Sequence, residues 1–358
     1  MIVNGQFVGY GRGDNGPEVE RVRYYLTEKF RWARDMGMTH GDYFDELTER
    51  VLIQFQKNVG LPAVGIANYA TRMRLYGLKP LPWQRITIYT FAGTWSAADW
   101  GFQADVARGL DPGFFTWAPI DYPASFGPIP GGPVTGITSL SYQESVEVAV
   151  RAGIKRIAAT PGKFVLGGYS QGAEAASRLL REIIHGGSLS HRASDFIGGY
   201  TFGNPCREEN HTWPGDTLVG RGISPNRIEG TPLTWHDYAH AGDMYTAVPK
   251  GDAGDDITAV YDVLTRLQIH DPFQMATDMV AALTGKGGLA EQIAELLGNP
   301  LNLIDAARAA GIAIRFAASG ARDHGTYGID DVMDGSGRSS VRHAIDSMNA
   351  YGRKVLAA

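Results

Sequence analysis

Apolar and polar residues follow two different rhythms along this chain. In residues 1–75, apolar side chains recur at steps of three and four, first over 19–30 and again over 44–55. This spacing predicts two or three short amphipathic helices, and Gly60 is typical of the stop after the second pattern.

After residue 85 the pattern changes to short apolar runs that alternate with helical segments. Runs rich in β-branched and aromatic residues are typical of buried strands, and their alternation with helices favours a parallel sheet covered by helices. The sequence therefore predicts an α/β fold. The expected strands are 86–91, 164–168, 196–202 and 233–238, and the expected helices are 141–158, 173–184 and 340–356.

Other segments interrupt this alternation. Residues 257–318 have the periodicity of four amphipathic helices, so we expect a helical insertion in the α/β core. Residues 92–138 are rich in Pro, Gly and aromatic residues with little periodicity, which is typical of a functional loop. Lys79-Pro80-Leu81-Pro82 cannot extend a helix. We therefore predict a small all-α domain at 1–78 and an α/β domain at 79–358.

Composition excludes several classes of function. The 358 residues carry 33 basic and 38 acidic side chains without long basic runs, which argues against a nucleic-acid-binding protein. The single cysteine, Cys206, excludes an internal disulfide and a cysteine-based zinc cluster. No apolar stretch reaches the roughly 18 residues of a transmembrane helix, and residues 1–16 lack the pattern of a signal peptide. We expect a soluble protein made in a cytosol, with no metal or organic cofactor.

The sharpest chemical feature is Gly168-Tyr169-Ser170-Gln171-Gly172, which lies between a predicted strand and a predicted helix. A serine on such a turn adopts strained dihedral angles, and small residues two positions away prevent a collision between strand and helix. The amides that start the helix can then face an oxygen that becomes negative. We interpret Ser170 as a nucleophile, and a glycine-rich turn with an ordinary serine is the alternative.

A serine nucleophile needs a histidine that takes its proton and an acid that orients the histidine, in the chain order Ser, Asp or Glu, His. His324 lies late in the chain in a polar glycine loop, from which an imidazole can approach the serine. His343 lies inside the last predicted helix, where we expect a solvated position. His240 is a second candidate for the base.

Asp243 is the favoured acid, because it follows a strand-like segment in a turn, where ligand-facing groups lie in α/β sheets. Asp237 is a second candidate. Helix capping or turn formation is the simpler interpretation of the remaining acids after the third strand, namely Asp216, Asp252, Asp255 and Asp256.

An oxyanion hole needs the amide that follows the nucleophile, here Gln171, and a second donor from an early strand-end loop. The first strand ends in Ala92-Gly93-Thr94-Trp95, so we assign the second donor to Thr94, with a glycine turn capped by threonine as the alternative. The aromatic residues of 95–126 can be core or the lining of an acyl groove, and the sequence favours neither.

Four segments together carry a resemblance to known proteins. They are the motif at 168–172, Phe202-Gly203-Asn204-Pro205, Ala239-His240-Ala241-Gly242-Asp243 and His324-x-x-Tyr327. Through these four segments, residues 83–356 resemble the cutinase-like serine esterases and, more closely, the mycobacteriophage endolysins called lysin B. Lysin B proteins are similar in having a helical insertion before the histidine and no disulfides. Cutinases are secreted and disulfide-bonded, so the single cysteine favours the phage branch.

The resemblance implies an α/β-hydrolase fold and an esterase that cleaves the link between mycolic acids and arabinogalactan in the mycobacterial envelope. It assigns Ser170 as nucleophile, Asp243 as orienting acid and His324 as base, with Thr94 and Gln171 at the oxyanion positions. It also implies that the protein stays in the host cytoplasm until lysis and then acts on the cell envelope.

Residues 13–65 resemble the small helical peptidoglycan-binding domain of wall hydrolases. The matching pieces are Gly16, Val19, Val22, Leu26 and the segment 55–61. The usual Gly-x-x-Thr segment before the second helix is replaced by Phe44-Asp45-Glu46-Leu47-Thr48. The resemblance implies contact with peptidoglycan, and a helical cap that stabilises the catalytic core is the alternative.

Three other functions compete with this interpretation. A generic cutinase or lipid esterase can use the same three residues. A non-catalytic phage protein that binds the cell wall can retain a degenerate hydrolase core. A peptidoglycan amidase is disfavoured, because the zinc-ligand clusters that it needs are missing from the sequence.

Overall fold

The computed structural model describes residues 2–3, 6–7, 9–77, 85–127, 140–266, 322–329 and 337–357. By its internal contacts the chain divides into two compact units, each built from separate stretches of sequence. Unit 1 comprises Met1–Ile86, Val106–Thr116 and Ile345–Ala358, and unit 2 comprises Thr87–Asp105 and Trp117–Ala344. The predicted boundary at 79–82 and residues 267–318 of the predicted insertion lie outside the described residues.

The N-terminal helices form where the apolar spacing predicts them. The side chains of Val19, Val22 and Leu26 are fully buried. Asp45 caps one helix by accepting a hydrogen bond from Thr48 N at 2.7 Å. The structure adds a fourth helix and two very short strands that the sequence did not predict. The elements are β1 (Ile2–Val3), β2 (Gln6–Phe7), α1 (Pro17–Lys29), α2 (Arg31–Asp35), α3 (Glu46–Asn58) and α4 (Tyr69–Tyr76).

A five-stranded sheet in the order β4-β3-β5-β6-β7 forms the centre of the α/β fold. The pairs β3–β5, β5–β6 and β6–β7 are parallel. Phe91 pairs with Gly168, and Tyr169 pairs with Phe202, so these strands end at the same edge of the sheet. The strands are β3 (Ile86–Phe91), β4 (Phe115–Pro119), β5 (Phe164–Tyr169), β6 (Phe196–Phe202) and β7 (Trp235–Tyr238).

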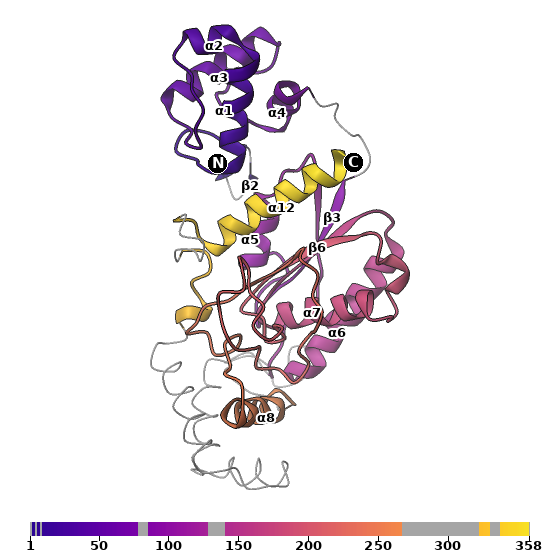
Figure 1. Cartoon of the computed structure of the whole chain (residues 1–358). Coiled ribbons are helices and arrows are strands. Elements are labelled where there is room, and N and C mark those ends of the chain that lie inside the picture. Colours follow the sequence, from indigo (N-terminus) through magenta and orange to yellow (C-terminus); the bar gives the residue numbers. More distant parts are fainter. Residues whose placement is uncertain are drawn as a thin grey trace. The chain divides into compact units, whose positions relative to one another are not determined.

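Helices α6 (Tyr142–Ala159) and α7 (Gln171–Ile184) lie side by side against this sheet (Figure 1). A capping box fixes the start of α6, because Ser141 and Glu144 each accept a hydrogen bond from the other's backbone amide. The two helices and the strands β3 and β5 bury a common apolar core, which includes Phe91, Val146, Ala149, Leu166, Ala176, Leu179 and Ile183.

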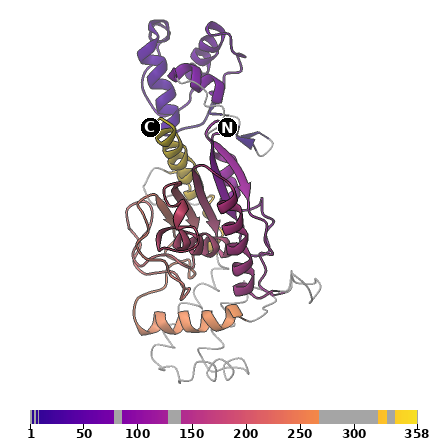
Figure 2. The ribbon, with the colours of Figure 1, turned by 90° about the vertical axis from the view of Figure 1, so that its right-hand side faces the viewer.

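Some element boundaries differ from the prediction. The stretch 92–138, expected to lack regular structure, contains α5 (Phe102–Gly109) and β4. Helix α8 (Asp252–Arg266) begins five residues before the predicted start at Ile257, because Asp252 and Asp255 occupy its first turn, where acidic side chains favour a helix. It lies across one end of the sheet (Figure 2).

The last described helix, α12 (Ser340–Ala357), agrees with the predicted one to within a residue, and two 3-10 helices, η2 (Ser190–Arg192) and η3 (Arg322–His324), were not predicted. Among the helices of the described residues, none is both long enough and apolar enough to cross a membrane.

Candidate active site

Ser170 lies at the turn between β5 and α7, with φ 54° and ψ −119°. A positive φ is costly for a residue that has a Cβ, so the surrounding fold must hold the serine in place. Both glycines of the motif are needed at this turn. A Cβ at Gly172 would lie 2.1 Å from the Phe91 carbonyl oxygen, and one at Gly168 would lie 2.6 Å from Ala173 Cα. The structure thus has the strand–serine–helix turn that the motif predicts.

The fold brings Ser170, His324 and Asp243 into one chain of hydrogen bonds. Ser170 Oγ lies 2.9 Å from His324 Nε2, and His324 Nδ1 lies 2.8 Å from Asp243 Oδ2. Asp243 is fully buried, and His324 is buried and lines the pocket that contains Ser170. In this geometry a carboxylate can orient an imidazole that accepts the proton of a serine hydroxyl.

The Asp243 carboxylate has further donors. Tyr327 donates its hydroxyl to Oδ2 at 2.7 Å, and the amide of Tyr245 donates to Oδ1 at 3.0 Å. The amides of Thr246 and Ala247 donate to the Asp243 carbonyl, at 3.1 and 2.9 Å, and so close the turn that follows β7. The predicted turn therefore holds the carboxylate in one orientation.

His324 is the last residue of η3, in the segment predicted as a polar loop. Its imidazole needs the space left by Gly203, where a Cβ would lie 2.6 Å from His324 Cε1. The ring of Tyr169 stacks on the imidazole with centroids 5.3 Å apart, and its hydroxyl donates to the His324 carbonyl at 3.0 Å. These contacts fix both the backbone and the ring of the histidine.

The two residues predicted for an oxyanion hole are Gln171, which follows Ser170 in the chain, and Thr94, which lines the pocket of Ser170. Gln171 is the first residue of α7, and a first-turn amide has no acceptor within its helix. The Gln171 side chain is buried and donates to the Ser125 carbonyl at 2.8 Å, so only the backbone N–H of Gln171 is suited to this role. Thr94 lines the pocket that contains Ser170. The assignment of both residues stays a prediction.

The second acid candidate, Asp237, is occupied elsewhere. Its carboxylate accepts hydrogen bonds from the Thr201 hydroxyl, from Asn204 Nδ2 at 2.7 Å and from Trp235 Nε1 at 3.1 Å. Burial raises the pKa of Asp237, and the bonds from Thr201 and Asn204 oppose that increase. This carboxylate crosslinks β6 and β7.

The other histidines also have different partners. His240 Nδ1 lies 2.9 Å from the Asp323 carbonyl oxygen, and its ring stacks on Tyr327. The expectation of a solvated His343 is wrong: the residue is buried, with Nδ1 3.0 Å from the Tyr238 hydroxyl, because α12 packs this face against β7. Among the described hydrogen bonds, the histidine that contacts Ser170 Oγ is His324.

A cavity of about 190 Å³ opens beside Ser170 and His324. Most of its remaining lining is aromatic, so it suits an apolar group placed next to the serine. Phe126 belongs both to this lining and to the core, and Trp95 packs against the core, so the aromatic stretch 95–126 serves both purposes. The lining residues are Thr94, Ser96, Phe126, Tyr142, Tyr169, Ser170, Pro205, Tyr245, Tyr261 and His324.

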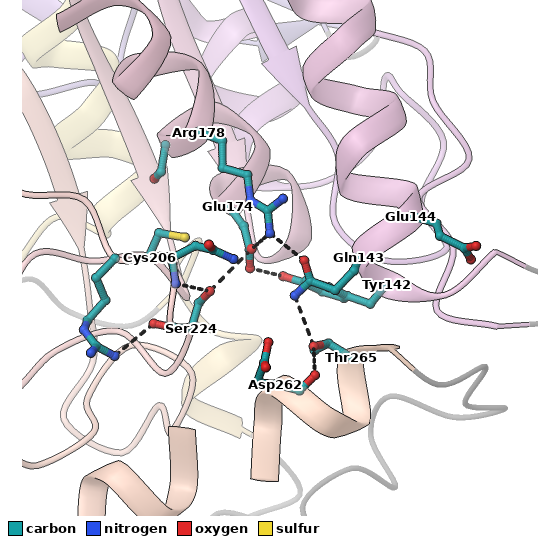
Figure 3. A network of polar contacts seen from close by, with 12 residues as sticks. Tyr142, Gln143, Glu144, Glu174, Arg178, Cys206, Ser224, Asp262 and Thr265 are labelled. Carbon is teal, nitrogen blue, oxygen red and sulfur yellow. Dashed lines mark hydrogen bonds and ion pairs between the residues drawn. The ribbon is translucent and has the colours of Figure 1, made fainter. Parts of the chain in front are cut away.

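A buried polar network supports one wall of the cavity (Figure 3). Tyr142 donates its hydroxyl to Glu174 Oε2 at 3.1 Å, and Arg178 Nη2 donates to Glu174 Oε1 at 2.6 Å. The same Arg178 nitrogen contacts Gln143, whose amide donates to Thr265 Oγ1 of α8 at 3.1 Å. The network ties α6, α7 and α8 together behind the ring of Tyr142.

The sequence analysis missed the roles of Gly203, Tyr327 and Tyr169. All three residues stand in segments that carried the family resemblance, so the motifs were the available signal for them. Their roles depend on distances across the fold, which spacing along the chain does not provide.

Comparisons with known proteins give partial similarities. The chain is similar to the Endolysin B proteins of Mycobacterium phage L5 and Mycobacterium phage D29, with 33% and 31% identity over 169 residues. The alignment covers 42% of this chain and 61% of each relative, so the chain spans about three fifths of the length of the curated relatives that it matches. No family model matches the chain.

Two solved structures also align with it. One is lysin B from Mycobacteriophage D29, at 20% identity and a TM-score of 0.46, over 74% of this chain and 98% of that one. The other is a cutinase-like protein from Cryptococcus sp., at 18% identity and a TM-score of 0.35, over 46% of this chain and 78% of that one.

Proposed function

We propose that this chain is a serine esterase in which Ser170, His324 and Asp243 are the catalytic triad. The observation that carries the proposal is the pair of hydrogen bonds from Ser170 to His324 and from His324 to Asp243, at a strained strand-to-helix turn beside an aromatic cavity. Strained serines with an adjacent oriented histidine are activated nucleophiles.

In the first half of the proposed reaction, Ser170 Oγ attacks the carbonyl carbon of an ester while its proton passes to His324 Nε2. The carbonyl oxygen becomes an anion that the amides of Thr94 and Gln171 stabilise. Asp243 stabilises the imidazolium. The bond to the alcohol then breaks, the alcohol leaves with the proton from His324, and the acyl group remains on Ser170.

In the second half, water gives a proton to His324 and attacks the acyl carbon. The tetrahedral intermediate collapses, Ser170 Oγ leaves and regains the proton, and the carboxylic acid is released. Each step moves one proton between His324 and an oxygen, so the cycle needs no further reactant.

For the substrate, we propose the ester that joins mycolic acids to arabinogalactan, cleaved when the phage lyses its host. Two observations support this choice: the aromatic cavity suits a lipid acyl group, and the aligned relatives are phage endolysins. Under the proposal the protein stays in the host cytoplasm until lysis and then acts on the envelope.

The test is release of mycolic acid from purified mycolyl-arabinogalactan–peptidoglycan. We expect release by the wild-type chain and a loss on the order of 10⁶-fold in Ser170→Ala, because the nucleophile acts as a unit with its base. Ser188→Ala, which removes the hydroxyl of an exposed serine after α7, is the matched control and should retain full activity.

Two further assays distinguish the alternatives. Cleavage of simple lipid or polyester substrates without mycolic acid release supports a generic cutinase or lipid esterase. A folded wild-type chain whose Ser170 does not react with a fluorophosphonate supports a non-catalytic wall-binding protein and overturns the proposal.

We also propose that residues 13–65 contact peptidoglycan. Two aromatic side chains on this part, Tyr24 and Tyr43, are half exposed and available to stack on sugar rings. Co-sedimentation of the full chain with purified peptidoglycan tests the proposal. If these helices only stabilise the catalytic core, the chain stays in the supernatant.

A further inference from the structure

One oxygen of the Asp243 carboxylate serves two donors at once. Oδ2 lies 2.8 Å from His324 Nδ1 and 2.7 Å from the Tyr327 hydroxyl. Among the ion pairs of the described residues, the partner of Asp243 is His324. A fully buried carboxylate depends on such donors for its stabilisation, so each donor affects how strongly the other is held.

The direction of the Tyr327 hydroxyl is fixed by its other neighbour. The amide of His240 donates to the Tyr327 oxygen at 3.4 Å. Since an amide N–H can only donate, the phenolic hydrogen is left to point at Asp243. Burial and the charge of Asp243 raise the pKa of Tyr327 well above its ordinary value, which keeps the hydroxyl protonated as a donor.

The ring of Tyr327 is equally constrained. It stacks on His240 with centroids 4.2 Å apart, and it packs against Phe102 and Phe202 at 6.0 and 5.7 Å. The side chain is fully buried. A phenylalanine can keep all of these ring contacts and lose the hydroxyl alone.

We propose that Tyr327 is a positioning residue that sets how strongly Asp243 holds the proton of His324. The inference rests on the proposed triad. Without the Tyr327 hydroxyl, the carboxylate loses a donor and becomes a stronger acceptor for His324 Nδ1–H. The protonated imidazole is then favoured, so the neutral form that accepts the serine proton is reached only at higher pH.

Other titratable groups surround this pair and must be considered in a pH profile. Tyr169 from β5 and Tyr245 from the acid turn face the imidazole. The ring of His240 stacks on Tyr327, and Asp323 lies against Gly242. The buried Arg207 interacts with Asp243 through its charge, and the buried Asp237 interacts in the same way with Arg207. All six stay in every variant below, so their titration is common to all profiles.

The experiment measures the rate constant for fluorophosphonate labelling of Ser170 between pH 4.5 and pH 9 in wild type, Tyr327→Phe and Tyr238→Phe, a range of about two units either side of an ordinary histidine. Tyr238 is the matched control, because it is a fully buried tyrosine that also packs on Phe202, but its hydroxyl contacts His343 instead of Asp243.

We expect the acid limb of the Tyr327→Phe profile to shift upward by about half to one pH unit, since only part of the effect of losing a hydrogen bond to a charged carboxylate reaches the histidine. Tyr238→Phe should keep the wild-type midpoint. An unshifted or downward-shifted Tyr327→Phe profile, or an equal shift in Tyr238→Phe, overturns the inference. A wild type whose Ser170 is never labelled contradicts the proposed function instead.

A second variant covers the case in which Tyr327→Phe does not fold. Site-specific 3,5-difluorotyrosine at position 327 keeps the ring and the hydroxyl but makes the hydroxyl a stronger donor. The acid limb should then move downward, opposite to the shift in Tyr327→Phe. A profile identical to wild type shows that the hydroxyl does not act on the Asp243–His324 pair.

Discussion

Several side chains of the candidate site approach one another only because a glycine leaves room. A Cβ at Gly203 would lie 2.6 Å from His324 Cε1, and a Cβ at Gly242 would lie 1.7 Å from Asp323 Oδ2. Gly203 also has φ 58°, which other residues rarely adopt. The position of the His324 imidazole therefore depends on the absence of a side chain at these glycines as well as on its hydrogen bonds.

His236 gives a prediction of the pH dependence of stability. Burial lowers the pKa of His236 to about 3, and the nearby His343 and His211 act in the same direction. The unfolded chain takes up a proton near pH 6.5, whereas the folded chain stays neutral at this residue until about pH 3. Stability from the neutral His236 is therefore present above about pH 6.5 and is lost as the pH falls toward 3.

The variant His236→Phe removes this titration and keeps an aromatic ring against Trp213, which stacks on His236 at 3.9 Å. Between about pH 6 and pH 4, we expect the free energy of unfolding to change less steeply with pH, by up to about 1.4 kcal/mol per pH unit. Denaturant titrations at several pH values measure this slope. An unchanged slope means that His236 is already protonated in the fold.

At the scale of elements, the sequence predicts best where the pattern is long and repeated. Helices α6 and α7 and strands β3 and β6 agree with their predicted ranges to within a few residues, because their apolar faces repeat over several turns or fill a buried strand. Strand β4 has a mixed burial pattern, and α5 is two turns long, so neither gives a periodic signal. The motif identified Ser170, and chain order with loop position identified Asp243 and His324, but their hydrogen bonds, and the role of Tyr327, needed the fold.

Helix α7 carries a buried ion pair that leads to an element-scale prediction. Glu174 is fully buried and accepts from Arg178, four residues later on the same helix. Arg178→Met leaves the carboxylate without its cation, and we expect a loss of about 3 kcal/mol in the free energy of unfolding. Adding Glu174→Gln should restore part of it, because the uncompensated charge is then gone. Guanidinium chloride titration measures both changes.

The control for this prediction is Arg151→Met on α6. Arg151 pairs with Glu147 at 3.5 Å over the same four-residue spacing, but both side chains are mostly exposed. Such surface pairs contribute about 0–1 kcal/mol. Equal losses in Arg151→Met and Arg178→Met contradict the importance of burial at Glu174.

At the scale of the whole molecule, unit 1 is held by charges from three separate stretches of sequence. Arg72 pairs with Glu18 at 3.6 Å and, more closely, with Asp111. Glu18 in turn pairs with Arg353 of α12 at 2.9 Å. Glu18, Arg72 and Asp111 are each at most 2% exposed, so their charges have little solvent to replace a lost partner.

We expect Arg72→Met to lower the free energy of unfolding by about 3–5 kcal/mol, because the buried carboxylates of Glu18 and Asp111 both lose the guanidinium that pairs with them. Arg12→Met is the matched control. Arg12 contacts Glu49 at 2.8 Å and Glu46 at 3.5 Å, but it is exposed, so its loss should cost less than about 1 kcal/mol. Thermal unfolding of both variants measures the difference, and a small effect of Arg72→Met contradicts the role of the cluster.

The sequence could not reveal this organisation. Its composition and its Pro-rich segment suggested a division into consecutive domains, and the boundary itself stays a prediction. Asp111 lies in a turn just after α5 and Arg353 on an amphipathic helix, and neither position shows from the sequence that it contacts Glu18 or Arg72. Residues that pair over such separations carry no local periodicity.

The three-part construction of unit 1 also has a consequence for the time course of synthesis. A ribosome makes the N-terminal helices first and then the second stretch of unit 1, which ends at Thr116. The third stretch, which lies in α12, begins only at Ile345, 229 residues later. At about 5–20 residues per second this interval lasts roughly 10 to 45 seconds. During it Glu18 has no Arg353 to pair with, so we expect the N-terminal helices of a nascent chain to resist protease only after α12 has left the exit tunnel.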